Sequence, residues 1–155
     1  MASTFVNNLR VAEPADGDAD WGTSTNTSLE LIGEALGVGT EGITTNADTH
    51  TSTVADGATD PARALHLQYT GTLDSACTIT IAPNTLKRVQ IIENATSGSQ
   101  SIIIKQGSGA TVTILAGTKR IVYLDGAGSG AAVVDITAAA FGAQAFYVPS
   151  GTTGN

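Results

Sequence analysis

The chain has 155 residues, which fit one domain with extensions and can bury only a modest core. Its 14 acidic residues outweigh its 7 basic ones, for a formal charge of −7, and this balance excludes nucleic acid as an expected partner because a phosphate backbone would be repelled. Only 14% of the residues are charged, against about 25% in a typical domain. That composition suits a protein that hides surface against neighbours, and a plain Thr-rich soluble β-protein is the alternative.

Cysteine content and hydropathy exclude further classes. Cys77 is the single cysteine, so the chain has no intrachain disulfide and no cysteine-based metal cluster. Residues 1–10 lack the apolar run of a signal peptide, and no stretch approaches 18 uninterrupted apolar residues. We therefore expect synthesis in a cytoplasm and no membrane insertion.

The N-terminal segment is short and acidic. Residues 3–11 are compatible with an edge strand or a docking arm, and residues 14–20 form a turn-rich acidic loop. Three aspartates in this loop alternate like the start of a calcium-binding loop, but Trp21 stands where that loop needs Gly and Thr27 where it needs Glu. An EF-hand is excluded, and we predict no metal site.

Residues 21–37 predict the one helix. Residues 27–30 match a capping box, and Gly37 is placed as a C-terminal stop. A helix of about ten residues is marginal alone in water, so its apolar stripe needs either the β-domain or sister helices about a threefold axis. The stripe and the aromatic residue beside it are Leu29, Ile32, Leu36 and Trp21.

Residues 38–61 are polar and nearly free of large apolar side chains. Such a segment cannot fold by itself, so we expect a linker or an arm that orders against a neighbouring chain. The GxGxxG match at residues 37–42 follows a helix rather than a strand, which argues against a nucleotide site. His50 lies in this segment and is expected to face solvent.

Residues 62–136 predict the β-domain. Short β-branched runs separated by turn residues recur roughly every 8–12 residues, a spacing typical of a sandwich or barrel. The predicted fold class is therefore all-β, a small antiparallel β-sandwich or jelly-roll-like domain with an N-terminal arm and a short helix. No internal repeat of 20–50 residues is visible, which disfavours a solenoid. The expected strands are residues 64–69, 76–81, 87–93, 101–105, 111–114, 118–124 and 131–136.

The sequence shows little sign of a catalytic site. His50 and His66 are the only histidines, and no serine lies in a nucleophile elbow. His66 alternates with Leu65 and Leu67, which is typical of a strand residue with a partner on its own face. We predict no enzyme activity, no catalytic residues and no cofactor.

Five of the seven basic residues lie in the expected strands of the β-domain: Lys87, Arg88, Lys105, Lys119 and Arg120. Residues 87–88 and 119–120 each open a strand and are expected to line one rim of the sandwich. They either protect strand edges by their charge or contact the acidic loop of a neighbouring subunit.

The C-terminal residues 137–155 form an uncharged apolar tail. An apolar tail is poorly tolerated on a free surface, so we expect it to pack onto the body of a trimer or onto a larger particle. Together with the helix stripe, its aromatic residues are the predicted oligomer or particle interface. These are Phe141, Phe146 and Tyr147.

The order TGTL, TITIAP, ENATSG, SIIIKQGSGATVTI and AGTKRIVYLDG within residues 62–136 resembles a small β-domain of tailed-phage virion proteins, chiefly tail fibres. Residues 14–37 are similar to a P-x-x-G-D-x-x-W-G pattern and helix near the start of such proteins, although Thr25 stands where the family usually has Leu. The matching residues are Pro14, Gly17, Asp18, Trp21, Gly22, Asn26, Leu29, Ile32, Leu36 and Gly37.

The resemblance implies a non-enzymatic structural protein located in the virion, a homotrimer of tail-fibre or appendage type. Its implied partners are other virion proteins of the capsid or tail and, for a fibre, a host surface receptor. A capsid decoration or head-fibre protein is the alternative, because the chain has no long coiled coil or β-helical shaft. A small carbohydrate-binding module is the further alternative, for which only Tyr69 and Tyr123 are aromatic residues of the β-region.

Overall fold

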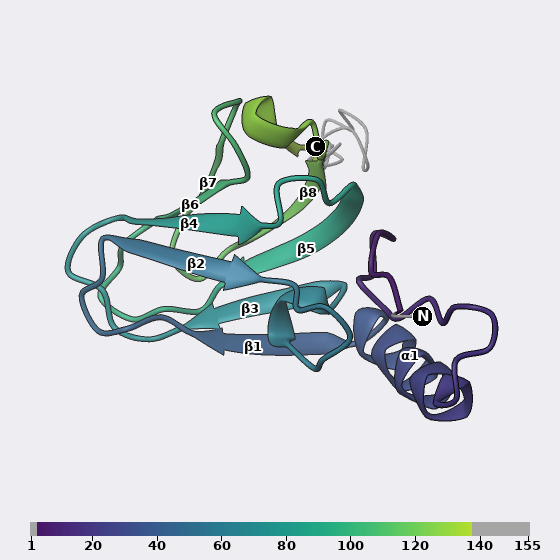
Figure 1. The fold of residues 1–155 in the computed structure, drawn as a ribbon. Helices are drawn as coiled ribbons and strands as arrows, with labels where there is room; N and C mark the ends of the chain where they lie inside the picture. The colour runs from purple at the N-terminus through teal and green to yellow at the C-terminus, as the bar shows by residue number, and fades with distance from the viewer. Residues whose placement is uncertain (1–2, 138–155) are drawn as a thin grey trace, which may run out of the picture.

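The structure is a computed structural model that describes residues 3–137 (Figure 1). Within these residues, one α-helix is followed by nine strands and two short 3-10 helices. The seven strands β3 to β9 begin and end within two residues of the predicted positions, because β-branched runs and turn residues mark them locally, whereas β1 and β2 were not predicted. The elements are α1 Trp21–Ala35, β1 Val38–Gly42, β2 Thr49–Thr53, η1 Pro61–Arg63, β3 His66–Thr70, β4 Cys77–Ala82, β5 Arg88–Asn94, β6 Ile102–Lys105, β7 Val112–Ile114, β8 Lys119–Leu124, η2 Gly128–Gly130 and β9 Val133–Asp135.

The strands form two sheets, and their pairing overturns the predicted fold class. One sheet has the order β1-β3-β5-β8-β9 and the other the order β2-β4-β6-β7. Strands β1, β3 and β5 pair in parallel, as do β2, β4 and β6, and only the β5–β8, β8–β9 and β6–β7 pairs are antiparallel. The molecule is a mixed α/β protein, so the antiparallel all-β sandwich or jelly roll was wrong.

Strands β1 to β6 alternate between the two sheets, so this part of the chain winds as a short coil. Val38 pairs with His66, and His66 pairs in turn with Ile91. One turn of the coil therefore takes roughly 25–29 residues, within the range of repeat architectures. No sequence repeat marks these turns, because they share a path while differing in sequence and connection length.

The core lies between the sheets and is made by the alternate residues that face inward. In β4 and β6 these positions are mostly isoleucine, and their side chains are fully buried. The period-2 alternation that marked the strands thus also identified their buried faces. The main inward-facing apolar residues are Leu67, Tyr69, Cys77, Ile79, Ile81, Ile92, Ile102, Ile104, Val112, Ile114, Val122, Leu124 and Val133.

Residues 38–61, expected as a linker or arm, supply β1 and β2, the edge strands of the two sheets. These strands carry polar residues inward: Nε2 of His50 lies 2.7 Å from Oε1 of Glu41, and the Ser52 hydroxyl lies 2.7 Å from the Tyr69 hydroxyl. The expectation that His50 faces solvent was wrong. In the first turn of the coil, hydrogen bonds between polar side chains join the two sheets. In later turns, isoleucine side chains pack between the sheets instead.

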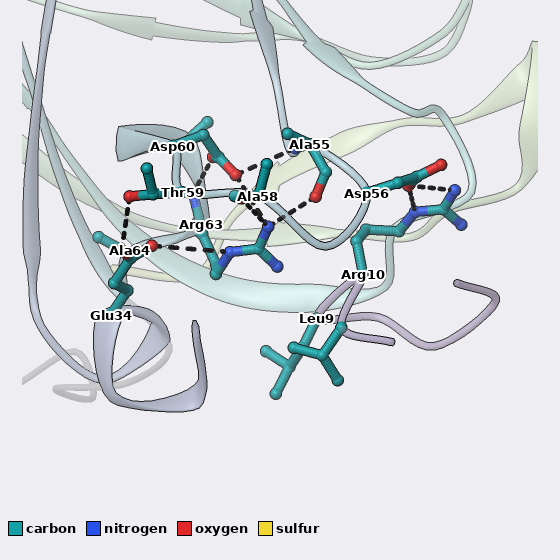
Figure 2. Close-up of polar contacts among 12 residues, drawn as sticks. Leu9, Arg10, Glu34, Ala55, Asp56, Ala58, Thr59, Asp60, Arg63 and Ala64 are labelled. Atoms are coloured by element: carbon teal, nitrogen blue, oxygen red, sulfur yellow. Dashed lines mark hydrogen bonds and ion pairs between the residues drawn. The ribbon is translucent and has the colours of Figure 1, made fainter. Parts of the chain in front are cut away.

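The connection from β2 to β3 is built around a buried arginine (Figure 2). The Arg63 side chain has no exposed surface, and its Nη2 donates to the carbonyls of Ala55 and Ala58 and to Asp60. Asp60 also accepts the backbone N–H of Arg63 at 2.8 Å, which caps η1. This network satisfies carbonyls that no strand partner reaches and fixes the path between turns.

Candidate assembly interface

The N-terminal arm leads the chain to the start of α1. Arg10 forms a 2.6 Å ion pair with Asp56, and its carbonyl accepts the N–H of Gly57 (Figure 2). Asn8 accepts the N–H of Lys87 at 3.0 Å. Residues 3–13 thus form an arm docked on the body, with one isolated bridge between Thr4 and Glu13, rather than an edge strand.

Helix α1 begins at the first residue of its predicted span, ahead of the predicted capping box. The carbonyl of Asp20 accepts the N–H of Ser24, and the side chain of Asp18 accepts the N–H of Asp20. The helix therefore starts at Trp21, and the predicted capping box at residues 27–30 was wrong because those residues lie inside it. Gly37 lies just past the end, where its N–H bonds to the carbonyl of Glu34.

The helix docks on the body through a small mixed face. Ser28 and Leu31 are its buried residues, and the Ser28 hydroxyl donates to the carbonyl of Ala12 at 3.1 Å. Farther along, Glu34 accepts the hydroxyl of Thr59 and lies 4.0 Å from Nε of Arg63. These contacts fix the orientation of α1 relative to β1 and η1.

The predicted apolar stripe lies to one side of this buried face. At 3.6 residues per turn, its four residues lie within about 80° of one another around the helix axis. Leu29 and Leu36 are 62% and 74% exposed, and Val38 at the start of β1 continues the exposed surface. We call this surface, defined by Trp21, Leu29, Ile32, Leu36 and Val38, the helix face. The other predicted interface residues, Phe141, Phe146 and Tyr147, lie outside the described residues.

The surroundings of the helix face are acidic. Residues 11–37 contain Glu13, Asp16, Asp18, Asp20, Glu30 and Glu34 and no Lys or Arg. An open hollow of about 630 Å³ lies between the acidic loop and Trp21. Within residues 3–137, no cluster of three or more His, Cys, Asp or Glu side chains is arranged to hold a metal ion.

The remaining polar residues take structural positions. His66 pairs with Glu93 at 2.9 Å on the outer face of the five-stranded sheet, as expected of a strand histidine with a partner. Burial raises the pKa of the Tyr69 phenol well above its ordinary value, since Tyr69 lies in the core beside Ser52. Gly39 lies against the carbonyl of Pro61, so its glycine serves a close backbone approach rather than a phosphate loop.

The basic pairs do not lie where the sequence suggested. Residues 87–88 and 119–120 each lie at the start of a strand. Because β5 and β8 are antiparallel, the two starts are at opposite ends of the strand pair and do not form one rim. Both strands are interior to the sheet, which rules out edge protection as their role. Sequence reasoning also missed that the outward positions of these strands are apolar, although alternation from the buried positions would have identified them.

Comparison of the sequence with family models and curated proteins, and of the fold with solved structures, finds no match. Over the described residues, none of the helices combines the length and apolar character needed to cross a membrane.

Proposed function

We propose that this chain is a non-enzymatic structural protein of a tailed-phage particle, of tail-fibre or appendage type, that assembles as a homotrimer. The helix face carries the proposal. A 15-residue helix that buries only Ser28 and Leu31 while presenting four apolar side chains to solvent is suited to a surface that another protein covers.

The phage assignment rests on the sequence resemblance. The fold identifies the strands that the resembling segments form. The segments TITIAP, SIIIK and KRIVYL coincide with β4, β6 and β8, whose inward side chains make the core. The shared pattern therefore describes a scaffold rather than a reaction site. Both histidines engage carboxylates, and the Ser52 hydroxyl bonds to Tyr69, so these groups act in packing.

Capsid decoration, or a head-fibre role, is the second candidate. The described residues contain one helix of 15 residues and a coil of fewer than three turns, so this part of the chain forms no extended shaft. The carbohydrate-module alternative is weakened because Tyr69 is buried, which leaves Tyr123 as the exposed aromatic residue of residues 62–136.

Purified particles of the phage that encodes the chain test the proposal. We expect mass spectrometry to find the protein in the particles and antibody labelling to place it on the tail or its appendages. Labelling over the capsid would favour decoration instead. Absence from the particles would refute both.

The purified protein separates the two candidates further. A tail fibre should bind host cells and block infection, whereas a decoration protein should bind expanded heads and raise their stability. The Leu29→Asp variant should lose either activity, and Thr23→Asp, which adds the same charge at an exposed position on the opposite side of the same helix, should keep it.

A further inference from the structure

The outer face of the five-stranded sheet carries a second exposed apolar surface. Val89, Tyr123 and Val134 lie side by side across β5, β8 and β9 and are 39–47% exposed. The next row, Ile91 beside Ile121, is half-buried. We call these five residues the outer patch. A sheet face turned to water normally carries polar residues, so this patch is suited to a partner.

The outer patch has a charge environment opposite to that of the helix face. Residues 62–136 contain six basic and four acidic residues, whereas residues 11–37 contain six acidic and none basic. Lys119 flanks the patch but is paired with Glu93 at 2.9 Å, whereas Lys87 is exposed two residues before Val89 and forms no ion pair within residues 3–137. Both surfaces are therefore apolar, with acidic residues at the margin of the helix face and the positive charge of Lys87 at the margin of the outer patch.

The two surfaces cannot meet within one chain. Helix α1 contacts β1 and η1, and β1 is one edge strand of the five-stranded sheet. The outer patch lies on β5, β8 and β9, and β9 is the strand at the opposite edge of the sheet. Figure 1 shows α1 beside β1 and well away from β8. Covering one surface with the other requires a second copy.

We propose that the helix face of one copy packs against the outer patch of the next copy, in a head-to-tail contact that closes into a ring. This inference rests on the proposed homotrimer and names its interface. A symmetric contact between helix faces would place the acidic loops of both copies, which lie beside Trp21, in one interface, and like charges at an interface oppose association. A contact between different surfaces on opposite edges avoids this repulsion and repeats around a closed ring.

Cysteine cross-linking tests the contact. The native Cys77 is fully buried, and burial raises the pKa of its thiol, so the wild-type protein provides the unreactive baseline. Leu29→Cys and Tyr123→Cys place thiols on the two surfaces, and a short bismaleimide is the probe. We expect each single variant to remain uncross-linked, while the double variant yields covalent dimers and trimers.

Two controls make the test specific. The double variant Leu29→Cys with Leu115→Cys carries its second thiol on an exposed leucine after β7 of the other sheet, and it should give no product. Lys87→Glu added to the productive pair should reduce the cross-linked trimer. Circular dichroism of each variant confirms that the fold is retained.

Several outcomes would overturn the inference. Cross-linking of Leu29→Cys alone would show that helix faces meet each other, and a monomer-sized product from Tyr123→Cys with Phe146→Cys would assign the outer patch to the chain's own residues 138–155. In both cases a native trimer mass and presence on particles would leave the proposed function standing. A wild-type protein that stays a monomer, together with a double variant Leu29→Cys, Tyr123→Cys that gives no intermolecular cross-link, overturns the contact. Absence of the protein from particles as well refutes the function.

Discussion

The Glu41 carboxylate in β1 lies 2.7 Å from Nε2 of His50 in β2, so one polar contact joins the edge strands of the two sheets. The His50 ring also meets the ring of Tyr69 edge-on, with 6.2 Å between ring centroids. Both partners of the pair are mostly shielded from water. The first turn of the coil is thus held together by the contacts of His50 with Glu41 and Tyr69.

Replacing His50 by Ala should lower the free energy of unfolding by about 1–3 kcal/mol, because the half-buried Glu41 loses its partner. Thr51→Ala, on the outward face of the same strand, should change it by less than about 0.5 kcal/mol. Urea denaturation measures both. Equal losses would show that the Glu41–His50 contact contributes nothing.

Glu93 should make stability depend on pH. The hydrogen bond from Lys119 holds the pKa of the Glu93 carboxyl below its ordinary value of 4.5, and His66 acts in the same direction. A lowered folded-state pKa means that the contribution is present above the ordinary value and is lost as the pH falls through the folded-state value.

Glu93→Gln should therefore be less stable than the wild type at neutral pH, by about 0.2–1 kcal/mol for a partly exposed pair. The difference should shrink as the pH falls below about 4.5 and the wild-type carboxyl becomes protonated. Denaturation midpoints across this pH range measure it. A difference that grows on acidification would contradict the assignment.

The two arginines of Figure 2 offer a matched pair of substitutions. Arg63→Met should cost about 3–5 kcal/mol, because Asp60 and two carbonyls lose a buried donor. Arg10→Met removes an ion pair with the half-exposed Asp56 and should cost less than about 1 kcal/mol. Similar costs for the two variants would show that the buried network adds no stability.

Alanine substitutions at two glycines with positive φ distinguish the cost of backbone strain from the cost of steric overlap. Gly17→Ala should cost about 1–2 kcal/mol, because φ is 76° but no atom lies within 4 Å of the added methyl. At Gly98, where φ is 97°, the methyl would also overlap the carbonyl oxygen of Leu73. Gly98→Ala should therefore cost about 1–3 kcal/mol more, measured by thermal unfolding. An equal cost would mean that the Leu73 segment moves freely.

A substitution on the helix face should change the mass of the oligomer. Leu29→Asp should lower the association constant by roughly 10- to 100-fold, since it removes an apolar side chain worth about 1.5–3 kcal/mol when buried. Light scattering at micromolar concentration should show the mass falling toward one chain of 15.6 kDa, with the β-sheet spectrum unchanged. Thr23→Asp, on the opposite side of the helix, should keep the wild-type mass. Loss of mass in both variants would point to charge rather than to the helix face.

The sequence determined where the strands lie and which of their residues face the core. Ile79 and Ile81 alternate with Thr78 and Thr80, and that period of two is a local property of an extended chain. The helix was also visible locally, from the spacing of Leu29, Ile32 and Leu36. The proposed interface on α1 therefore came from residues that the pattern alone selects.

Only the tertiary structure decided how those elements pair. Alternation is the same in parallel and antiparallel strands, so nothing local indicates that His66 pairs with Val38 and Ile91 rather than with a hairpin neighbour. Helix α1 has apolar residues on two sides, and the hydroxyl of Ser28 reaching the Ala12 carbonyl settles which side turns inward. The polar strands β1 and β2 escaped prediction for the same reason, because Glu41 and His50 become tolerable inside only once the two sheets bring them together.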